Sequence, residues 1–302
     1  MEEPRELQTS ISDKRPSLVQ IHLAVLLFGF AGVLGKNIDA GPVVITFGRT
    51  SLAAAALLIG MLPAGVSLSI KKPRDFATLL LSGMLLALHW YTFFESIRIS
   101  SVAVGLITFS TFPIFVTFME PRFFGERLHR SDIWAALAVI TGVALVVPSF
   151  DFGNDVTRGV FWGVLSGFSF AILSLLNRMH VRFYSPAAVT FYQQAFATLF
   201  SLPVVLIVGE LPSKEGLLLI LVLGVVCTAL AHGLFVAGLK HVKAQTAGIV
   251  SCLEPVYGIV AAVVLTGELP TLRTIAGGLI ILGSVFFSTL MQEKPEDKPD
   301  WV

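Results

Sequence analysis

A glutamate placed deep inside an apolar segment is the residue in this sequence best suited to chemistry. Glu254 lies about ten residues into the apolar run 244–266 and directly precedes Pro255. Because proline lacks an N–H and loosens the backbone hydrogen bonds of the preceding turn, a carboxylate and freed carbonyl oxygens can lie together here. Such a site can bind a cation, an amine or a proton. Alternatively, Glu254 is a protonated or ion-paired residue that pins two helices together.

Small and polar side chains recur at helical spacing around this glutamate. They are Ala247, Ser251, Glu254, Gly258 and Ala261. A helix face of this kind is typical of a cavity lining or of a close helix neighbour, and not of a face that contacts lipid. Ser251 is therefore a second candidate for ligand contact.

Aromatic residues occupy the corresponding stretch earlier in the chain. Pro113 lies 142 residues before Pro255 (255 − 113 = 142), and Phe109, Ser110 and Phe112 precede it. A carboxylate on one side and aromatic rings on the other suit an amphipathic ligand. We therefore hypothesise that an amine faces Glu254 while an apolar part faces the two phenylalanines. The alternative is that these rings are ordinary packing.

Two apolar runs contain histidine. His89 stands beside Trp90 and Tyr91 in the run 76–95, and His232 lies in the run 216–239. Histidine changes charge near physiological pH, so either residue can relay a proton. The alternative is a hydrogen-bonded packing role. Trp90 and Tyr91 are candidates for lining a cavity or for the aromatic belt at the membrane surface.

Arg49 is the one basic residue placed inside an apolar run. It lies about 10 Å into the run 43–62, at 1.5 Å of helical rise per residue. A guanidinium at this depth must be satisfied by a carboxylate or by backbone carbonyl oxygens. We interpret it as structural, with ligand contact as the alternative.

The elements that hold these residues are membrane spans. Apolar residues make up 55% of the chain and charged residues only 14%, against about 25% in soluble domains. The net charge of +1 gives no indication of a nucleic-acid partner. The apolar runs lie at 17–36, 43–62, 76–95, 99–119, 132–149, 159–178, 187–208, 216–239, 244–266 and 273–292. Each is near the roughly 20 residues that cross a bilayer as a helix, so we expect an all-α integral membrane protein with ten transmembrane helices.

Basic residues predict the orientation of these spans. With both termini in the cytoplasm, fifteen of the 21 Lys and Arg residues fall on cytoplasmic segments, five on outer loops and one within a span. Cytoplasmic loops of membrane proteins carry this excess. We therefore predict that the N- and C-termini are cytoplasmic.

The two halves of the chain repeat one motif. Pro113, Gly125 and Glu126 in the first half answer Pro255, Gly267 and Glu268 in the second, each 142 residues later. Five spans per half is an odd number, so the second half enters the membrane upside down. Inverted repeats of this kind are typical of transporters. We expect Glu126 and Glu268, at the membrane–water boundary, to hold the start of the following helix.

These motifs resemble the EamA-type members of the drug/metabolite transporter superfamily. The resemblance rests on the repeated Pro…Gly-Glu signature, on "GPVVITFGR" ending at Arg49, on "GLKHVKAQTAG" from Gly238, and on Gly142 and Gly283 in the last helix of each half. It implies a polar leader at 1–17, five-helix repeats at 18–150 and 159–291, and a tail at 292–302, with both polar ends cytoplasmic. It also implies a multi-pass secondary transporter of the inner (plasma) membrane.

The function predicted from these features is export of a small amphipathic metabolite, such as an amino acid or amine. Uptake of a vitamin or other metabolite, and drug efflux, are alternatives on the same scaffold; a channel or sensing subunit is an alternative of another class. Neither an H-E-x-x-H pair nor a Walker-type loop is present, so we expect no enzyme, metal or cofactor. The expected partners are the substrate and the bilayer, with proton coupling as a further hypothesis and no obligate protein partner.

Overall fold

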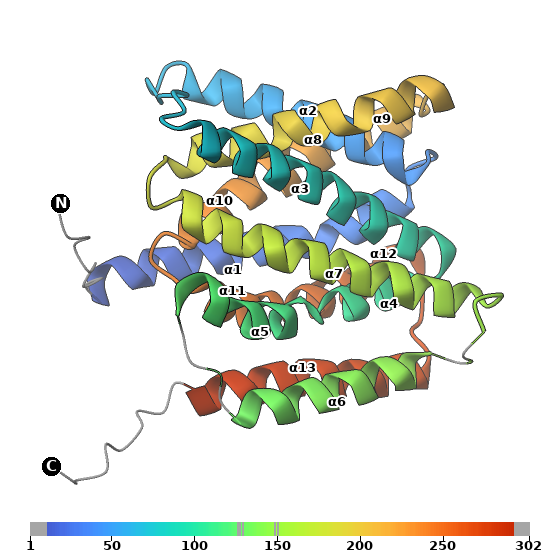
Figure 1. The fold of residues 1–302 in the computed structure, drawn as a ribbon. Helices are drawn as coiled ribbons and strands as arrows, with labels where there is room; N and C mark the ends of the chain where they lie inside the picture. The colour runs from blue at the N-terminus through green and yellow to red at the C-terminus, as the bar shows by residue number, and fades with distance from the viewer. Residues whose placement is uncertain (1–10, 126–127, 129, 148, 150, 293–302) are drawn as a thin grey trace, which may run out of the picture.

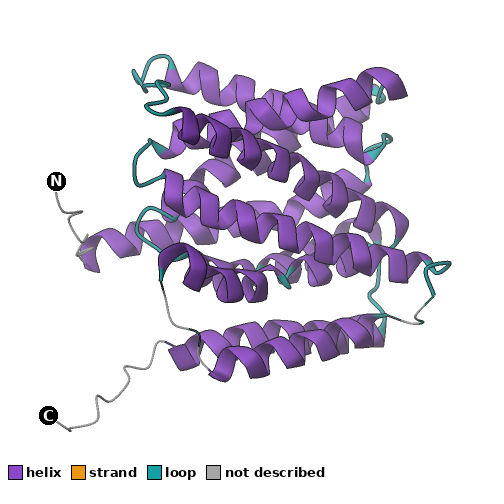
Figure 2. Ribbon diagram, viewed as in Figure 1, coloured by secondary structure: helices purple, strands orange, loops and turns teal. Residues whose placement is uncertain are grey.

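The computed structural model describes residues 11–125, 128, 130–147, 149 and 151–292, and every regular element within these ranges is a helix (Figure 2). The elements are α1 (Ile11–Lys36), α2 (Pro42–Met61), α3 (Pro73–Ile99), α4 (Val102–Phe109), α5 (Phe112–Phe124), α6 (Arg130–Val146), α7 (Asp155–His180), α8 (Pro186–Val208), α9 (Lys214–Gly224), the π-helical turn η1 (Val225–Leu230), α10 (Ala231–Gly238), α11 (Ala244–Ser251), α12 (Glu254–Thr266) and α13 (Leu272–Gln292).

Most of these helices have the length and composition of membrane spans. Eight stretches are long and apolar enough to cross a bilayer, and two shorter apolar helices, Asp132–Val146 and Leu272–Phe287, lie within α6 and α13. Large apolar side chains cover the outside of the bundle, and Ile207 is 84% exposed. Because a soluble protein does not leave so much apolar surface in water, this outer surface fits a hydrocarbon environment.

Two spans are broken at equivalent places. Residues 110–111 separate α4 from α5, and residues 252–253 separate α11 from α12. In each case a proline, Pro113 or Pro255, stands at the start of the second helix, where its missing N–H costs no hydrogen bond. The sequence predicted one continuous run at each place, with a loosened turn before Pro255, and the prolines account for the breaks.

The contacts between helices follow the repeat. Helix α1 packs against α10, α11 and α12, while α7 packs against the equivalent helices α3, α4 and α5 of the first half. The pairs α2–α8 and α6–α13 each join two equivalent helices (Figure 1). The centre of the bundle is therefore an interface between the two halves.

Glycine lets helices from the two halves touch at this interface. A Cβ on Gly258 of α12 would lie 2.7 Å from the carbonyl oxygen of Gly29 in α1. In the same way, a Cβ on Gly163 of α7 would lie 1.8 Å from Thr108 Oγ1 of α4. Since real side chains do not approach this closely, these contacts require glycine.

The two ends of the bundle differ in their charges. Helix α1 begins and α13 ends at one end, which also holds the α2–α3, α7–α8 and α10–α11 connections (left in Figure 1). We name it the basic end after the residues on these connections and their borders, Lys71, Lys72, Arg74, Arg182 and Lys240. The other end, here called the opposite end, holds the α1–α2, α3–α4, α8–α9 and α12–α13 connections.

Candidate functional site

A small cavity lies at the centre of the bundle, between the two halves. Its walls come from α1, α3 and α4 of the first half and from α7, α11 and α12 of the second. The lining residues are Phe28, His89, Trp90, Phe109, Phe170, Ser251 and Glu254. The volume of this cavity is only about 10 Å³, which is room for about one water molecule. The structure therefore shows this site in a closed form.

Glu254 contributes the carboxylate of this cavity. It is the first residue of α12 and only 4% exposed. Within the described part of the chain, its carboxylate has no hydrogen bond and no ion pair, and its charged partner is the guanidinium of Arg49, which attracts it without touching it. The amino end of a helix carries a partial positive charge that favours a nearby anion. A buried carboxylate without a hydrogen bond or ion pair is costly, so this group is suited to bind a cation or a proton from the cavity.

Ser251 adds a hydroxyl group to the same wall. It is the last residue of α11, and its hydroxyl donates to the carbonyl oxygen of Ala247 at 2.9 Å. The donor of this hydroxyl is therefore used inside the helix, while its oxygen lone pairs are free to accept. A ligand that donates hydrogen bonds fits both Ser251 and Glu254.

Aromatic rings form most of the remaining wall. The ring centre of Phe109 lies 5.2 Å from that of His89 and 5.4 Å from that of Phe170. Phe112 stacks on Phe109 with ring centres 5.2 Å apart, but it does not line the cavity. Phe109 thus lines the cavity, whereas Phe112 lies behind it, and contact between Phe109 and a ligand stays a prediction.

The sequence analysis did not single out Phe28 or Phe170. They lie on α1 and α7, which are equivalent helices, and they are 142 residues apart (170 − 28 = 142). Their ring centres lie 5.9 and 5.7 Å from that of Phe235. The offset of the repeat was the signal that could have identified this pair.

Arg49 supports the wall from outside the cavity. Its guanidinium carbon lies 3.3 Å from the ring centre of Trp90, which lines the cavity. Its Nε and Nη2 donate to Thr228 Oγ1 at 2.9 and 2.7 Å, and Nη2 also reaches the carbonyl oxygen of Cys227 at 3.3 Å. Arg49 is fully buried and its Nη1 has no partner. Backbone and hydroxyl oxygens thus satisfy most of this guanidinium, and its structural role stays an interpretation.

The two histidines have separate environments. His89 lines the cavity, and its Nδ1 lies 2.8 Å from Ser166 Oγ. His232 lies outside the cavity, with Nε2 3.0 Å from Gln193 Oε1. Gln193 in turn donates to Asn177. These contacts suit packing residues, and proton transfer by either histidine stays a hypothesis.

Two other candidates lie away from the cavity. Tyr91 is half-buried, and its ring meets the edge of Trp162 with ring centres 6.1 Å apart. Ser110 is buried in the break between α4 and α5, where its hydroxyl donates to the carbonyl oxygen of Leu106 at 2.9 Å. The structure therefore does not bring Tyr91 or Ser110 together with Glu254.

The glycines of the repeated signature end helices. Gly125 follows α5 and Gly267 follows α12, with φ angles of 71° and 70°. This left-handed conformation favours glycine, because a side chain there would be strained. Glu126 lies outside the described residues.

The signature glutamate of the second half binds an unexpected partner. Glu268 accepts a hydrogen bond from the N–H of Val102, the first residue of α4, at 2.7 Å and pairs with Lys36 at 2.9 Å. The sequence predicted that it would hold the following helix, α13. Thr271 instead caps α13, accepting from the N–H of Thr274 at 3.1 Å. The prediction was wrong about the partner because Glu268 reaches across to the other half of the chain.

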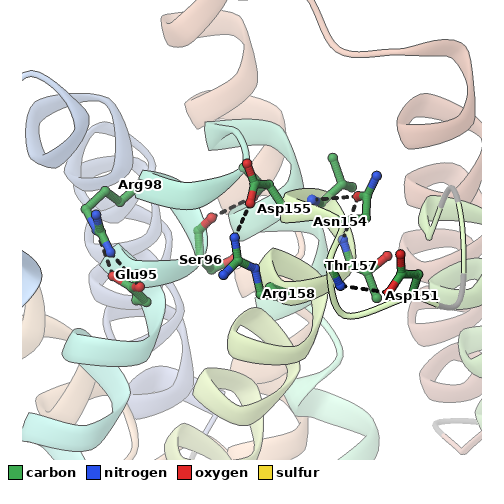
Figure 3. Close-up of polar contacts among 11 residues, drawn as sticks. Glu95, Ser96, Arg98, Asp151, Asn154, Asp155, Thr157 and Arg158 are labelled. Carbon is green, nitrogen blue, oxygen red and sulfur yellow. Dashed lines mark hydrogen bonds and ion pairs between the residues drawn. The ribbon is translucent and has the colours of Figure 1, made fainter.

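Two further charged pairs near the opposite end each lie within one helix. Glu95 pairs with Arg98 along α3, and Asp155 pairs with Arg158 along α7 (Figure 3). Asn154 accepts from the N–H of Val156 at 2.9 Å and so caps α7. These residues stabilise single helices and lie away from the cavity. No cluster of three metal-binding side chains occurs among residues that the structure describes.

Comparison with known proteins gives one family. The EamA-like transporter family matches residues 16–147 and 157–290. The pseudopaline exporter CntI of Pseudomonas aeruginosa is 28% identical, over 86% of this chain and 91% of its own. The S-adenosylmethionine uptake transporter of Rickettsia conorii is 26% identical, over 75% and 76%. A crystal structure with 18% identity has the same fold, with a TM-score of 0.70 over 91% of this chain and 96% of that one.

Proposed function

Because this chain belongs to the EamA-like transporter family, whose members are membrane transport proteins and not enzymes, we propose that it exports a small amphipathic metabolite that carries an amine. The observation that carries this proposal is the carboxylate of Glu254, which is buried, has no hydrogen bond or ion pair within the described residues and faces an aromatic cavity between the two halves. An amine can bind the carboxylate while the rest of the ligand contacts rings.

Alternating access is the mechanism that the repeat supports. The two halves are related by an offset of 142 residues, and their helices make equivalent contacts. In the proposed topology α6 and α13 complete ten spans, the basic end faces the cytoplasm and both termini lie there. Two inverted halves have two arrangements of similar energy, one open to each side of the inner membrane. A channel or sensing subunit does not need this symmetry.

The proposed coupling uses the same carboxylate. Glu254 cannot hold a proton and a positively charged amine at the same oxygen atoms. Proton entry from one side would therefore displace the amine, and amine binding from the other side would displace the proton. This exchange needs no cofactor and no second protein.

The similar proteins differ in the direction of transport. One similar protein is named an exporter and another an uptake transporter. Uptake of a metabolite is therefore the second candidate function. Both functions use the same central cavity and differ in the gradient that drives them.

A binding measurement tests the proposed ligand class. Purified protein would be heated with a panel of amines, amino acids, vitamins and carboxylic acids, and its unfolding temperature recorded. A ligand at a hundred times its Kd stabilises the folded state by about 2.7 kcal/mol. We expect amines to stabilise the wild type and Glu215→Gln, an exposed control on α9, but not Glu254→Gln. Equal stabilisation of all three proteins, or stabilisation by carboxylic acids alone, would contradict the proposal.

A further inference from the structure

Both carboxylate oxygens of Glu268 are bound by helices from the first half. Oε2 lies 2.9 Å from the Nζ of Lys36, the last residue of α1. Oε1 accepts from the N–H of Val102, the first residue of α4, at 2.7 Å. The first N–H groups of a helix have no partner within the helix, and its dipole favours an anion there. One carboxylate after α12 therefore joins α1, α4 and α12, and we name this contact the Glu268 latch.

The three latched helices are also walls of the central cavity. Phe28 of α1, Phe109 of α4 and Glu254 of α12 all line it. Along the three helices the latch lies about 10 to 20 Å from these residues, at 1.5 Å per residue. The latch thus joins α1, α4 and α12 at the opposite end. These helices must separate at that end if the cavity is to open toward it.

A small pocket lies beside the latch. Lys36 lines it together with Phe94, Ile97 and Arg98. Ile97 is 1% exposed, and a Cβ on Gly32 of α1 would lie 3.2 Å from its Cδ1. The side chain of Ile97 is therefore buried between α3 and α1, next to the start of α4. It would become accessible if α1 moved away.

The latch is built to be reversible. The side chains of Lys36 and Glu268 are 31% and 20% exposed, so water can replace their contact at a modest cost. Arg178 occupies the place of Lys36 in the second half (178 − 36 = 142), and at the basic end it bonds to Glu120 instead. The two ends of the bundle are therefore held by different contacts in this closed form.

We infer that the Glu268 latch closes the opposite end of the transport path and that its release opens that end. The inference rests on the proposed transport function for its meaning, but its test needs neither a substrate nor transport. If the protein bound no amine, the test would still show whether the Glu268 latch closes the opposite end. Conversely, a negative result for the latch would not contradict the proposal that Glu254 binds an amine.

The test measures the reactivity of a cysteine placed behind the latch. Ile97→Cys would be made in a chain whose two buried cysteines, Cys227 and Cys252, are replaced by alanine. A charged methanethiosulfonate reagent would be applied to the purified protein in detergent. We expect Glu268→Gln and Lys36→Met to raise the reaction rate about two- to fivefold, because each removes the ion pair, and Lys36→Arg to leave it unchanged.

The neighbouring pair on α3 provides the matched control. Glu95→Gln makes the same chemical change at the same end, but it breaks a 2.7 Å pair with Arg98 inside one helix (Figure 3). We expect no acceleration in this variant. An unchanged rate in both latch variants, or an equal increase in Glu95→Gln, would overturn the inference. Each variant must elute as one monodisperse peak from a size-exclusion column, which shows that it is folded. If Glu268→Gln does not fold, Lys36→Met still tests the inference, because it removes the ion pair and keeps the hydrogen bond from Val102 to Glu268.

Discussion

The guanidinium carbon of Arg49 lies 3.3 Å from the centre of the Trp90 ring. Trp90 lines the cavity and Arg49 does not, so the arginine supports the wall and does not face the ligand space. Its anchor is Thr228, 179 residues away in the π-helical turn η1. Turns of this kind are often found at functional sites. The position of one cavity wall in the first half thus depends on a turn of the second half.

Substitution of the arginine tests this arrangement. Arg49→Lys keeps the charge but cannot place two donors on Thr228 while stacking on Trp90. We expect a loss of about 1–2 kcal/mol of stability together with weaker amine binding. Thermal unfolding with and without ligand would measure both. Arg158→Lys, in an exposed pair on α7, is the control, and equal losses in the two variants would contradict a special role for Arg49.

Substitution of the threonine tests the anchor itself. Thr228→Val removes the oxygen that accepts two hydrogen bonds from Arg49, whereas Thr228→Ser keeps it. A buried charged donor left without its acceptor costs about 1–3 kcal/mol. We therefore expect a lower unfolding temperature for the valine variant and a nearly normal one for the serine variant. Identical behaviour of the two variants would show that the hydroxyl is not the anchor.

Two stacked phenylalanines are expected to differ in their effect on binding. Phe109 lines the cavity and Phe112 lies behind it. Loss of one cation–π contact is worth about 1 kcal/mol, so Phe109→Leu should raise the Kd for an amine about fivefold. Phe112→Leu should change the Kd less than about twofold on the same scale. Titration of the purified variants would measure this, and the reverse order would place the ligand elsewhere.

The contact between α6 and α13 is closest at two facing glycines, Gly142 and Gly277. A Cβ on Gly277 would lie 2.6 Å from the carbonyl oxygen of Gly142, whereas a Cβ on Gly283 would meet nothing within 4 Å. Gly277→Ala should therefore lose about 1–3 kcal/mol of stability through overpacking. Gly283→Ala in the same helix should lose none. Thermal unfolding compares them, and equal stability of the two would contradict this contact.

Sequence periodicity grouped two residues that share the cavity wall. Glu254 and Ser251 lie on one face of a helical stripe, and the structure places both on the cavity wall. Pro255 predicted a weakened backbone, and the span is broken there. These features are local, because side-chain spacing and proline chemistry act within a few residues.

Contacts between distant segments could not be predicted in the same way. The partner of Arg49 is Thr228, and the partner of Glu268 is the backbone N–H of Val102. Neither pair has a sequence signature, since each arises only when the halves pack together. Phe28 and Phe170 are an intermediate case, because the repeat offset relates them but their aromatic character alone does not distinguish them from other rings.

Counterflow in proteoliposomes tests the central role of Glu254 most directly. Vesicles would be loaded with an unlabelled amine identified by the binding panel, and entry of the labelled compound would be followed. We predict counterflow by the wild type and by Glu215→Gln, and its loss in folded Glu254→Gln. Counterflow at the wild-type rate in Glu254→Gln would contradict the account and would leave this carboxylate as a residue that only pins two helices.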